Sequence, residues 1–85
     1  MRLRANDGVG VEILGDVVYA APLPDGPILV LEGVAALIWL EATAEPRGSV
    51  ADVVATATGQ DAASIRSYVE GFIDEMISRG LLVPE

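Results

Sequence analysis

The segment PILVLEG, residues 27–33, places four consecutive large aliphatic residues, Ile28 to Leu31, between a proline and an acid. A run this short, preceded by the turn residues Pro24-Asp25-Gly26, is typical of a strand. Side chains of a strand alternate between its two faces, so this one is apolar on both. We therefore expect a strand over 28–31 whose second face needs a cover.

Two earlier segments predict strands that pair with it. In residues 9–14 apolar residues alternate with Gly10 and Glu12, the period of a strand. Gly15-Asp16 is a turn signal, and residues 17–21 are rich in β-branched and aromatic types. Since the connections are short, we expect a three-stranded antiparallel meander.

The rest of the chain predicts three helices. Residues 33–43 carry apolar side chains at helical spacing. Ser49 with Asp52 resembles a capping box, which predicts a second helix over 50–58 that ends at Gly59.

A third and longer helix is expected to begin after Asp61, a capping residue, and to stop at Gly80, with Leu81-Leu82 folding back as a hydrophobic seal. Arg66 is placed to pair with Glu70 one turn later. The apolar stripe of this helix comprises Ile65, Val69, Phe72, Met76 and Ile77.

Strands followed by helices predict an α+β fold, here one domain over residues 1–85. Without a crossover connection, the helices can cover only one face of the sheet. The sheet should therefore keep one face and one edge open.

Composition excludes several functions. The chain has no cysteine and no histidine, so it lacks thiolate chemistry, the usual neutral-pH acid–base and the commonest metal ligand. We expect no active site, no metal and no cofactor. With thirteen acids against five arginines, the net charge of −8 disfavours nucleic acid as a partner.

Location can also be predicted. The two arginines near the N-terminus are followed by no apolar segment typical of a signal peptide. The longest apolar run, residues 34–40, is far shorter than the ~18 residues that span a bilayer. A cytoplasmic protein without membrane contact is expected.

The aliphatic strand leaves an edge to explain, because the third strand of a meander has one neighbour. Neither charge nor proline interrupts residues 28–31, although natural edges are usually blunted in this way. Such an edge fits either a homodimer seam or an incoming extended peptide. A simpler alternative is that Ile28 and Val30 face the helices while Leu29 and Leu31 lie under a loop or helix end.

Energetics indicate what a peptide site must contain. Each added ladder hydrogen bond gains about 1 kcal/mol, whereas ordering each peptide residue costs about 1–2 kcal/mol. Net affinity must therefore come from apolar pockets beside the edge. The third helix, with Ile65, Val69 and Phe72, is the candidate wall, and Arg66 could contact an acid or a carbonyl of the peptide.

Two other functions fit parts of the pattern. A winged-helix DNA-binding protein has the same order of elements, but the predicted second helix, residues 50–58, carries no basic residue. An acyl or peptidyl carrier protein has similar size and acidity. It needs a modifiable serine after an acid, and Ser64 in AASIR lacks that acid.

Three segments together resemble a known family. They are VVYAAPLPDGPILVLEGVAALIW, SVADVVATATG and IRSYVEGFIDEMISRGLL. Their order and spacing are similar to those of the PqqD family, peptide chaperones also called recognition elements for ribosomally made, modified peptides (RiPPs). The resemblance covers about residues 9–83, and it departs at Glu32-Gly33, where many members have Asn-Ser or Asn-Glu.

The resemblance implies a winged-helix-like α+β domain that binds the leader segment of a precursor peptide without catalysing a reaction. The leader would add a strand to the third strand, beside the third helix. It would then be presented to a modifying enzyme or a leader protease. The peptide-binding residues implied by position are Ile28, Leu29, Val30, Leu31, Ile65, Arg66, Val69, Phe72 and Ile73.

Overall fold

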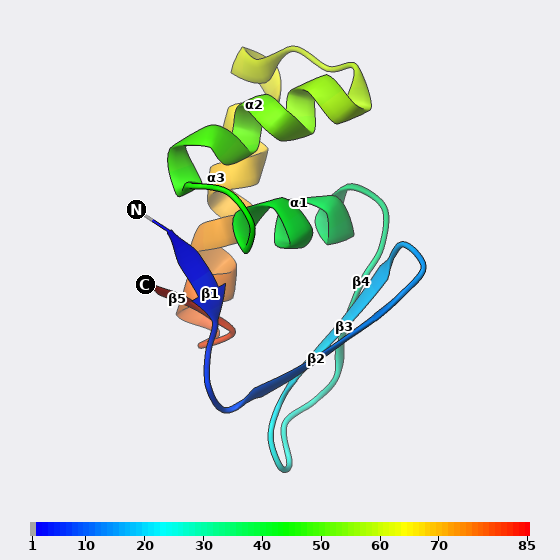
Figure 1. Ribbon diagram of the computed structural model, residues 1–85, viewed down its shortest axis with the longest axis vertical. Helices are drawn as coiled ribbons and strands as arrows, with labels where there is room; N and C mark the ends of the chain where they lie inside the picture. The colour runs from blue at the N-terminus through cyan, green and yellow to red at the C-terminus, as the bar shows by residue number, and fades with distance from the viewer. Residues whose placement is uncertain (1) are drawn as a thin grey trace.

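The computed structural model describes residues 2–85, and its α+β architecture confirms the predicted class (Figure 1). Two antiparallel sheets accompany three helices. The elements, in chain order, are β1 (Leu3–Ala5), β2 (Val9–Leu14), β3 (Val17–Pro22), β4 (Leu29–Leu31), α1 (Val34–Ala42), α2 (Arg47–Thr58), α3 (Ala62–Ser78) and β5 (Leu82–Pro84).

The predicted meander is confirmed as a three-stranded sheet in the order β2-β3-β4. β2 pairs with β3 along all six residues, whereas β4 pairs with β3 only through residues 29–31. Among residues 2–85, no strand pairs with the other edge of β4. The edge expected from the sequence is therefore open.

The pairing register assigns each residue of the aliphatic run to a face of the sheet. Val18 lies opposite Leu31 and Ala20 opposite Leu29, and opposite residues share a face. Val18 and Ala20 are fully buried in the core, so Leu29 and Leu31 point toward the helices.

The alternative that Ile28 and Val30 face the helices is therefore wrong. These two side chains lie on the outer face and are 68% and 48% exposed. All four residues of this run are aliphatic, so hydrophobicity alone does not indicate which two face the core. The sequence therefore could not predict which face of the strand is buried.

The two-stranded sheet of β1 and β5 was not predicted. Leu3 lies opposite Pro84 and Ala5 opposite Leu82, which joins the two ends of the chain. Leu3 and Leu82 are buried, so this pair closes the core beneath α3.

The end of α3 confirms the expected seal. The amide of Gly80, which has a φ of 74°, donates to the carbonyl of Ile77 at 3.0 Å, and the amide of Leu81 donates to Met76 at 2.9 Å. These two bonds form a Schellman motif, in which glycine adopts the left-handed conformation without steric cost. The motif turns the buried Leu81 back against the helix and leads into β5.

The start of α2 corrects the sequence prediction. The helix begins at Arg47, after Pro46, so Ser49 lies in its first turn and caps nothing. The Arg47 guanidinium contacts Glu70 at 3.2 Å and Asp74 at 2.6 Å, both on α3. These two long-range contacts hold Arg47 in place, and the helix begins three residues earlier than predicted. Hydrogen bonds to Asp74 and then to Glu70 raise the pKa of Arg47 above its ordinary value.

The other helix starts agree better with expectation. Asp61 is the N-cap residue of α3, although its carboxylate caps no amide and accepts a hydrogen bond from Ser64 Oγ at 3.3 Å. Gly33 precedes α1 with a φ of 59° and a ψ of −130°, a conformation that only glycine adopts readily. It gives the abrupt change of direction between β4 and α1.

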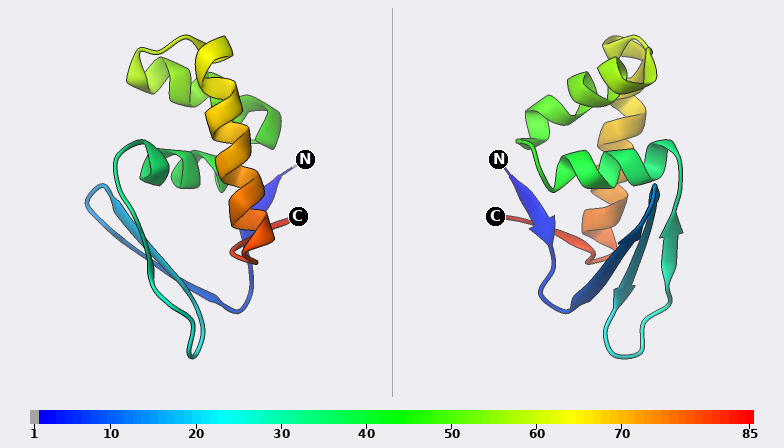
Figure 2. Two further views of the ribbon diagram at one scale, coloured as in Figure 1. Left: turned by 180° about the vertical axis from the view of Figure 1, so that it is seen from behind. Right: turned by 45° about the vertical axis from the view of Figure 1, so that its right-hand side comes forward.

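The core lies among the helices and the inner face of the sheet. Trp39 and Ile38 of α1 are at its centre, with α2 and α3 packed on α1. Figure 2 shows the three-stranded sheet projecting away from the helices, with α3 descending toward the chain ends. The sheet is therefore supported mainly at the end near α1.

Candidate functional site

The open edge of β4 lies on the same side of the molecule as α3 (Figure 2, left). A cavity of about 340 Å³ lies where the start of β4 meets the end of α3. We call it the proline cavity, and it is lined by Pro22, Pro27, Ile28, Leu29, Arg79 and Leu81.

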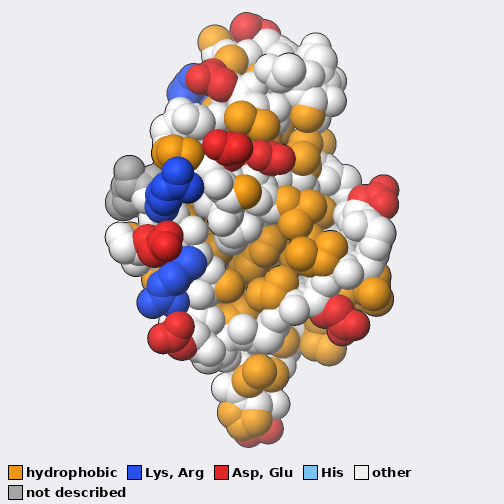
Figure 3. Space-filling model, viewed as in Figure 1, with side chains coloured by type: hydrophobic (Ala, Val, Ile, Leu, Met, Phe, Trp, Pro, Cys, Tyr) orange, Lys and Arg blue, Asp and Glu red, His pale blue; other side chains and the backbone are white. Residues whose placement is uncertain are grey.

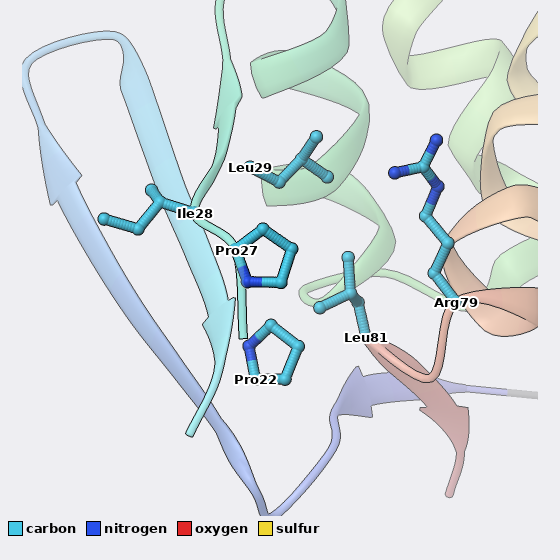
Figure 4. Close-up of a pocket in the computed structure, with 6 residues that line it drawn as sticks. All are labelled: Pro22, Pro27, Ile28, Leu29, Arg79 and Leu81. Carbon is cyan, nitrogen blue, oxygen red and sulfur yellow. The ribbon is translucent and has the colours of Figure 1, made fainter. Parts of the chain in front are cut away.

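Figure 4 shows how these side chains lie. Pro22 and Pro27 lie facing Leu81, and Leu29 and the Arg79 side chain point toward each other from opposite sides of the cavity. Ile28 points to the opposite side from Leu29, as expected for neighbouring residues in extended backbone. The cavity is thus apolar, with a guanidinium at its rim.

A second cavity of about 310 Å³ lies beyond the other end of β4. We call it the tyrosine cavity, and it is lined by Val34, Gln60, Ser64, Ile65 and Tyr68. Val34 is the first residue of α1, three positions after the end of β4. The two cavities therefore bracket the open edge.

One face of α3 joins the two cavities. Tyr68 lines the tyrosine cavity and Arg79 the proline cavity, eleven residues later. Eleven residues are close to three helical turns, so both side chains lie on one face, together with Phe72 and Glu75 between them. Tyr68 is 55% exposed and Phe72 half-buried. This face forms a wall beside the edge.

The structure places most of the wall residues implied by the resemblance elsewhere. Ile65, Val69 and Ile73 are buried in the core, and of these only Ile65 lines a cavity. Their stripe is the side of α3 that packs on α1 and α2. Phe72 lies between this buried stripe and the wall face.

Arg66 lies roughly 150° around the helix from Tyr68 and Arg79, as 3.6 residues per turn requires. It contacts Asp52 of α2 at 3.1 Å. The expected pair between Arg66 and Glu70 is therefore wrong, because Glu70 is bound by Arg47.

The strand residues implied by the resemblance divide between the two faces. Leu29 points toward the proline cavity and Leu31 is buried, whereas Ile28 and Val30 are exposed on the outer face. The backbone of Leu29, Val30 and Leu31 forms the open edge whichever way the side chains point, and Ile28 directly precedes it.

Sequence reasoning missed eight residues that line the cavities: Pro22, Pro27, Val34, Gln60, Ser64, Tyr68, Arg79 and Leu81. A signal existed for some of them. Prolines flank the aliphatic run, and Tyr68 is an aromatic residue off the apolar stripe of its helix. Leu81 and Arg79 meet the strand only through the chain reversal at Gly80.

The arginines bear on the alternative of DNA binding. The observed α2 does contain a basic residue, because it begins at Arg47, so the prediction of a helix without one is wrong. Arg47 is nevertheless held by two acids on α3, and Arg4, Arg66 and Arg79 each contact one carboxylate. These pairs leave α2 without a cationic face.

The described residues contain neither a metal-binding cluster nor a membrane-spanning helix. No group of three acids in residues 2–85 is placed to hold a metal ion. Within the same range, every helix is too short or too polar to cross a membrane.

Hydrophobic side chains are exposed on other faces as well. Figure 3 shows them gathered between α1 and the β2–β3 hairpin. Val11 and Ile13 share the inner face of the sheet but are 38% and 50% exposed. α1 therefore covers the β3–β4 side of this face better than the β2 side.

No protein-family model and no curated protein matches the sequence. A solved structure does match: TbiB1 in complex with the TbiA(beta) leader peptide. The identity is 18%, the alignment covers 96% of each chain, and the TM-score is 0.84. The chain has the fold of TbiB1. The fold that the sequence resemblance implied is thus confirmed.

Proposed function

We propose that this chain binds the leader segment of a ribosomally made precursor peptide, which adds a strand to the open edge of β4. The observation that carries the proposal is that edge, bracketed by two cavities and flanked by one face of α3. The likeness to TbiB1, whose structure contains a leader peptide, supports it.

The cavities supply what a strand ladder lacks. Ladder hydrogen bonds roughly offset the cost of ordering the peptide, as argued from the sequence. Burying one large apolar side chain contributes about 1.5–3 kcal/mol, so one in each cavity adds about 3–6 kcal/mol. Affinity should therefore depend mainly on two anchoring side chains.

In this proposal the peptide pairs antiparallel with β4, as β3 does, and this fixes its direction. β4 runs from the proline cavity toward α1, so an antiparallel partner runs from the tyrosine cavity to the proline cavity. The segment that follows the leader would then emerge beside Arg79 and the β3–β4 loop. In this proposal the chain itself catalyses nothing, and a modifying enzyme or leader protease collects the peptide from that end.

Calorimetry with the leader of a precursor encoded beside this chain tests the proposal. Tyr68→Ala removes a half-exposed wall residue and should weaken binding about tenfold, since it removes most of one aromatic contact. Tyr19→Ala is the matched control, because Tyr19 lies opposite Val30 on the outer face of the sheet and should leave affinity unchanged.

Wild-type protein that releases or absorbs no heat with this leader at high micromolar concentration would contradict leader binding. Equal losses in the two tyrosine variants would instead contradict the placement of the leader beside α3.

A further inference from the structure

The two cavities differ in charge. The tyrosine cavity is lined by apolar and neutral polar residues, whereas the proline cavity has one charged lining residue, Arg79. A cation there is notable in a chain of net charge −8. It marks one end of the β4 edge as different from the other.

The fold holds Arg79 at this place. It follows α3 in helical conformation, directly before the left-handed Gly80. The same chain reversal brings Leu81 into the cavity wall. The turn at Gly80 therefore positions both the guanidinium of Arg79 and the apolar side chain of Leu81. Figure 4 shows the guanidinium at the level of Leu29, on the opposite side of the cavity.

The ion pair that Arg79 makes in this structure is weak. Its guanidinium contacts Glu75 at 3.1 Å, and these side chains are 55% and 59% exposed. Exposed ion pairs one helical turn apart contribute little, because water screens them. A carboxylate held over the cavity by a bound peptide could therefore share or replace Glu75 at small cost.

Arg47 shows the contrast. Its side chain is only 20% exposed and already contacts two carboxylates, so it is committed to joining α2 to α3. Arg66 lies on the far side of α3 from both cavities, next to Asp52. Among the arginines of α2 and α3, Arg79 is the one placed to contact a peptide on β4.

We propose that Arg79 makes the site selective for peptides that carry an acidic residue two positions from the apolar residue filling the proline cavity. This inference rests on the proposed function. Residues two apart in a strand lie on the same face about 7 Å apart, within reach of an arginine side chain. Because the net charge of the chain is −8, the other peptide positions should be neutral or basic.

A displayed library of random twelve-residue peptides tests this selectivity. Wild-type protein should enrich peptides with a large apolar residue and an acid two positions away. Arg79→Glu should enrich a basic residue at that position instead. Arg4→Glu is the control, because it changes net charge equally and breaks a similar exposed pair, with Asp7 at 2.8 Å, away from both cavities. It should select as wild type does.

A synthetic peptide from the wild-type selection gives the quantitative test. Its affinity should fall about tenfold or more for Arg79→Glu, as expected for losing a charge-assisted hydrogen bond. Lysine in place of the acid should restore binding to that variant. Should Arg79→Glu fail to fold by circular dichroism, Arg79→Gln should show the loss without the inversion.

The outcomes separate the two proposals. Enriched apolar peptides without an acid preference, or with the same preference in Arg79→Glu, would overturn the role of Arg79 and leave strand addition standing. Failure of all three proteins to enrich any peptide would overturn both.

Discussion

The helical half and the three-stranded sheet of this molecule use apolar residues in opposite ways. Among residues 2–85, the sheet supplies only Val18, Ala20 and Leu31 to the eighteen buried core residues. The sheet and its β3–β4 loop nevertheless hold six of the seven large hydrophobic side chains that are exposed. Stability is therefore concentrated in the helices, and exposed apolar surface in the sheet.

This difference explains how an 85-residue chain can stay folded although one edge of its sheet is unpaired. A chain this small buries only about 60–65% of its unfolded surface, so it has little stability to spare. Joining the chain ends through β1 and β5, and α2 to α3 through Arg47, closes the helical half. The sheet can then remain incomplete without unfolding.

The largest expected effect separates the two halves. Trp39→Ala should lower the free energy of unfolding by about 3–5 kcal/mol, because it empties a fully buried site at the centre of the core. Ile28→Ala, in the sheet, should change it by less than about 0.5 kcal/mol, because Ile28 is 68% exposed. Urea unfolding gives the free energy of unfolding of both variants. It is followed by tryptophan fluorescence for Ile28→Ala and by circular dichroism for Trp39→Ala, which has no tryptophan. Similar losses of unfolding free energy in the two variants would contradict the conclusion that stability is concentrated in the helices.

A smaller effect tests how the helical half is closed. Arg47→Ala should cost about 1–2 kcal/mol, because it leaves Glu70 and Asp74 without their shared cation. Arg66→Ala removes the same side chain from a single exposed pair with Asp52 and should cost less than about 0.5 kcal/mol. Thermal unfolding compares the two variants. Equal shifts in melting temperature would show that the contacts of Arg47 stabilise the fold no more than the single exposed pair of Arg66.

Local patterns predicted the elements that short-range rules control. The meander, the end of α2 at Gly59 and the reversal at Gly80 all follow from turn chemistry or side-chain period. The β1–β5 pair escaped prediction, because two three-residue segments almost eighty positions apart have no local signal. The extra turn of α2 escaped it for a similar reason, since its anchor is on another helix.

The open edge of β4 was predicted, but the side chains beside it were not. The open edge followed from strand order, whereas the wall was assigned to the apolar stripe of α3, which is the part that the core buries. The exposed wall is mixed in character, with Tyr68, Glu75 and Arg79, and so leaves no apolar period to detect. A surface that stays accessible for a partner is the part that hydrophobic periodicity describes least well.

Amide hydrogen exchange at residues 28–31 tests strand addition most directly. With the cognate leader peptide bound, we expect slower exchange there and in the last turn of α3, while β2 exchanges as before. Unchanged exchange at residues 28–31 in a saturated complex would show that the peptide binds elsewhere, and would contradict the account.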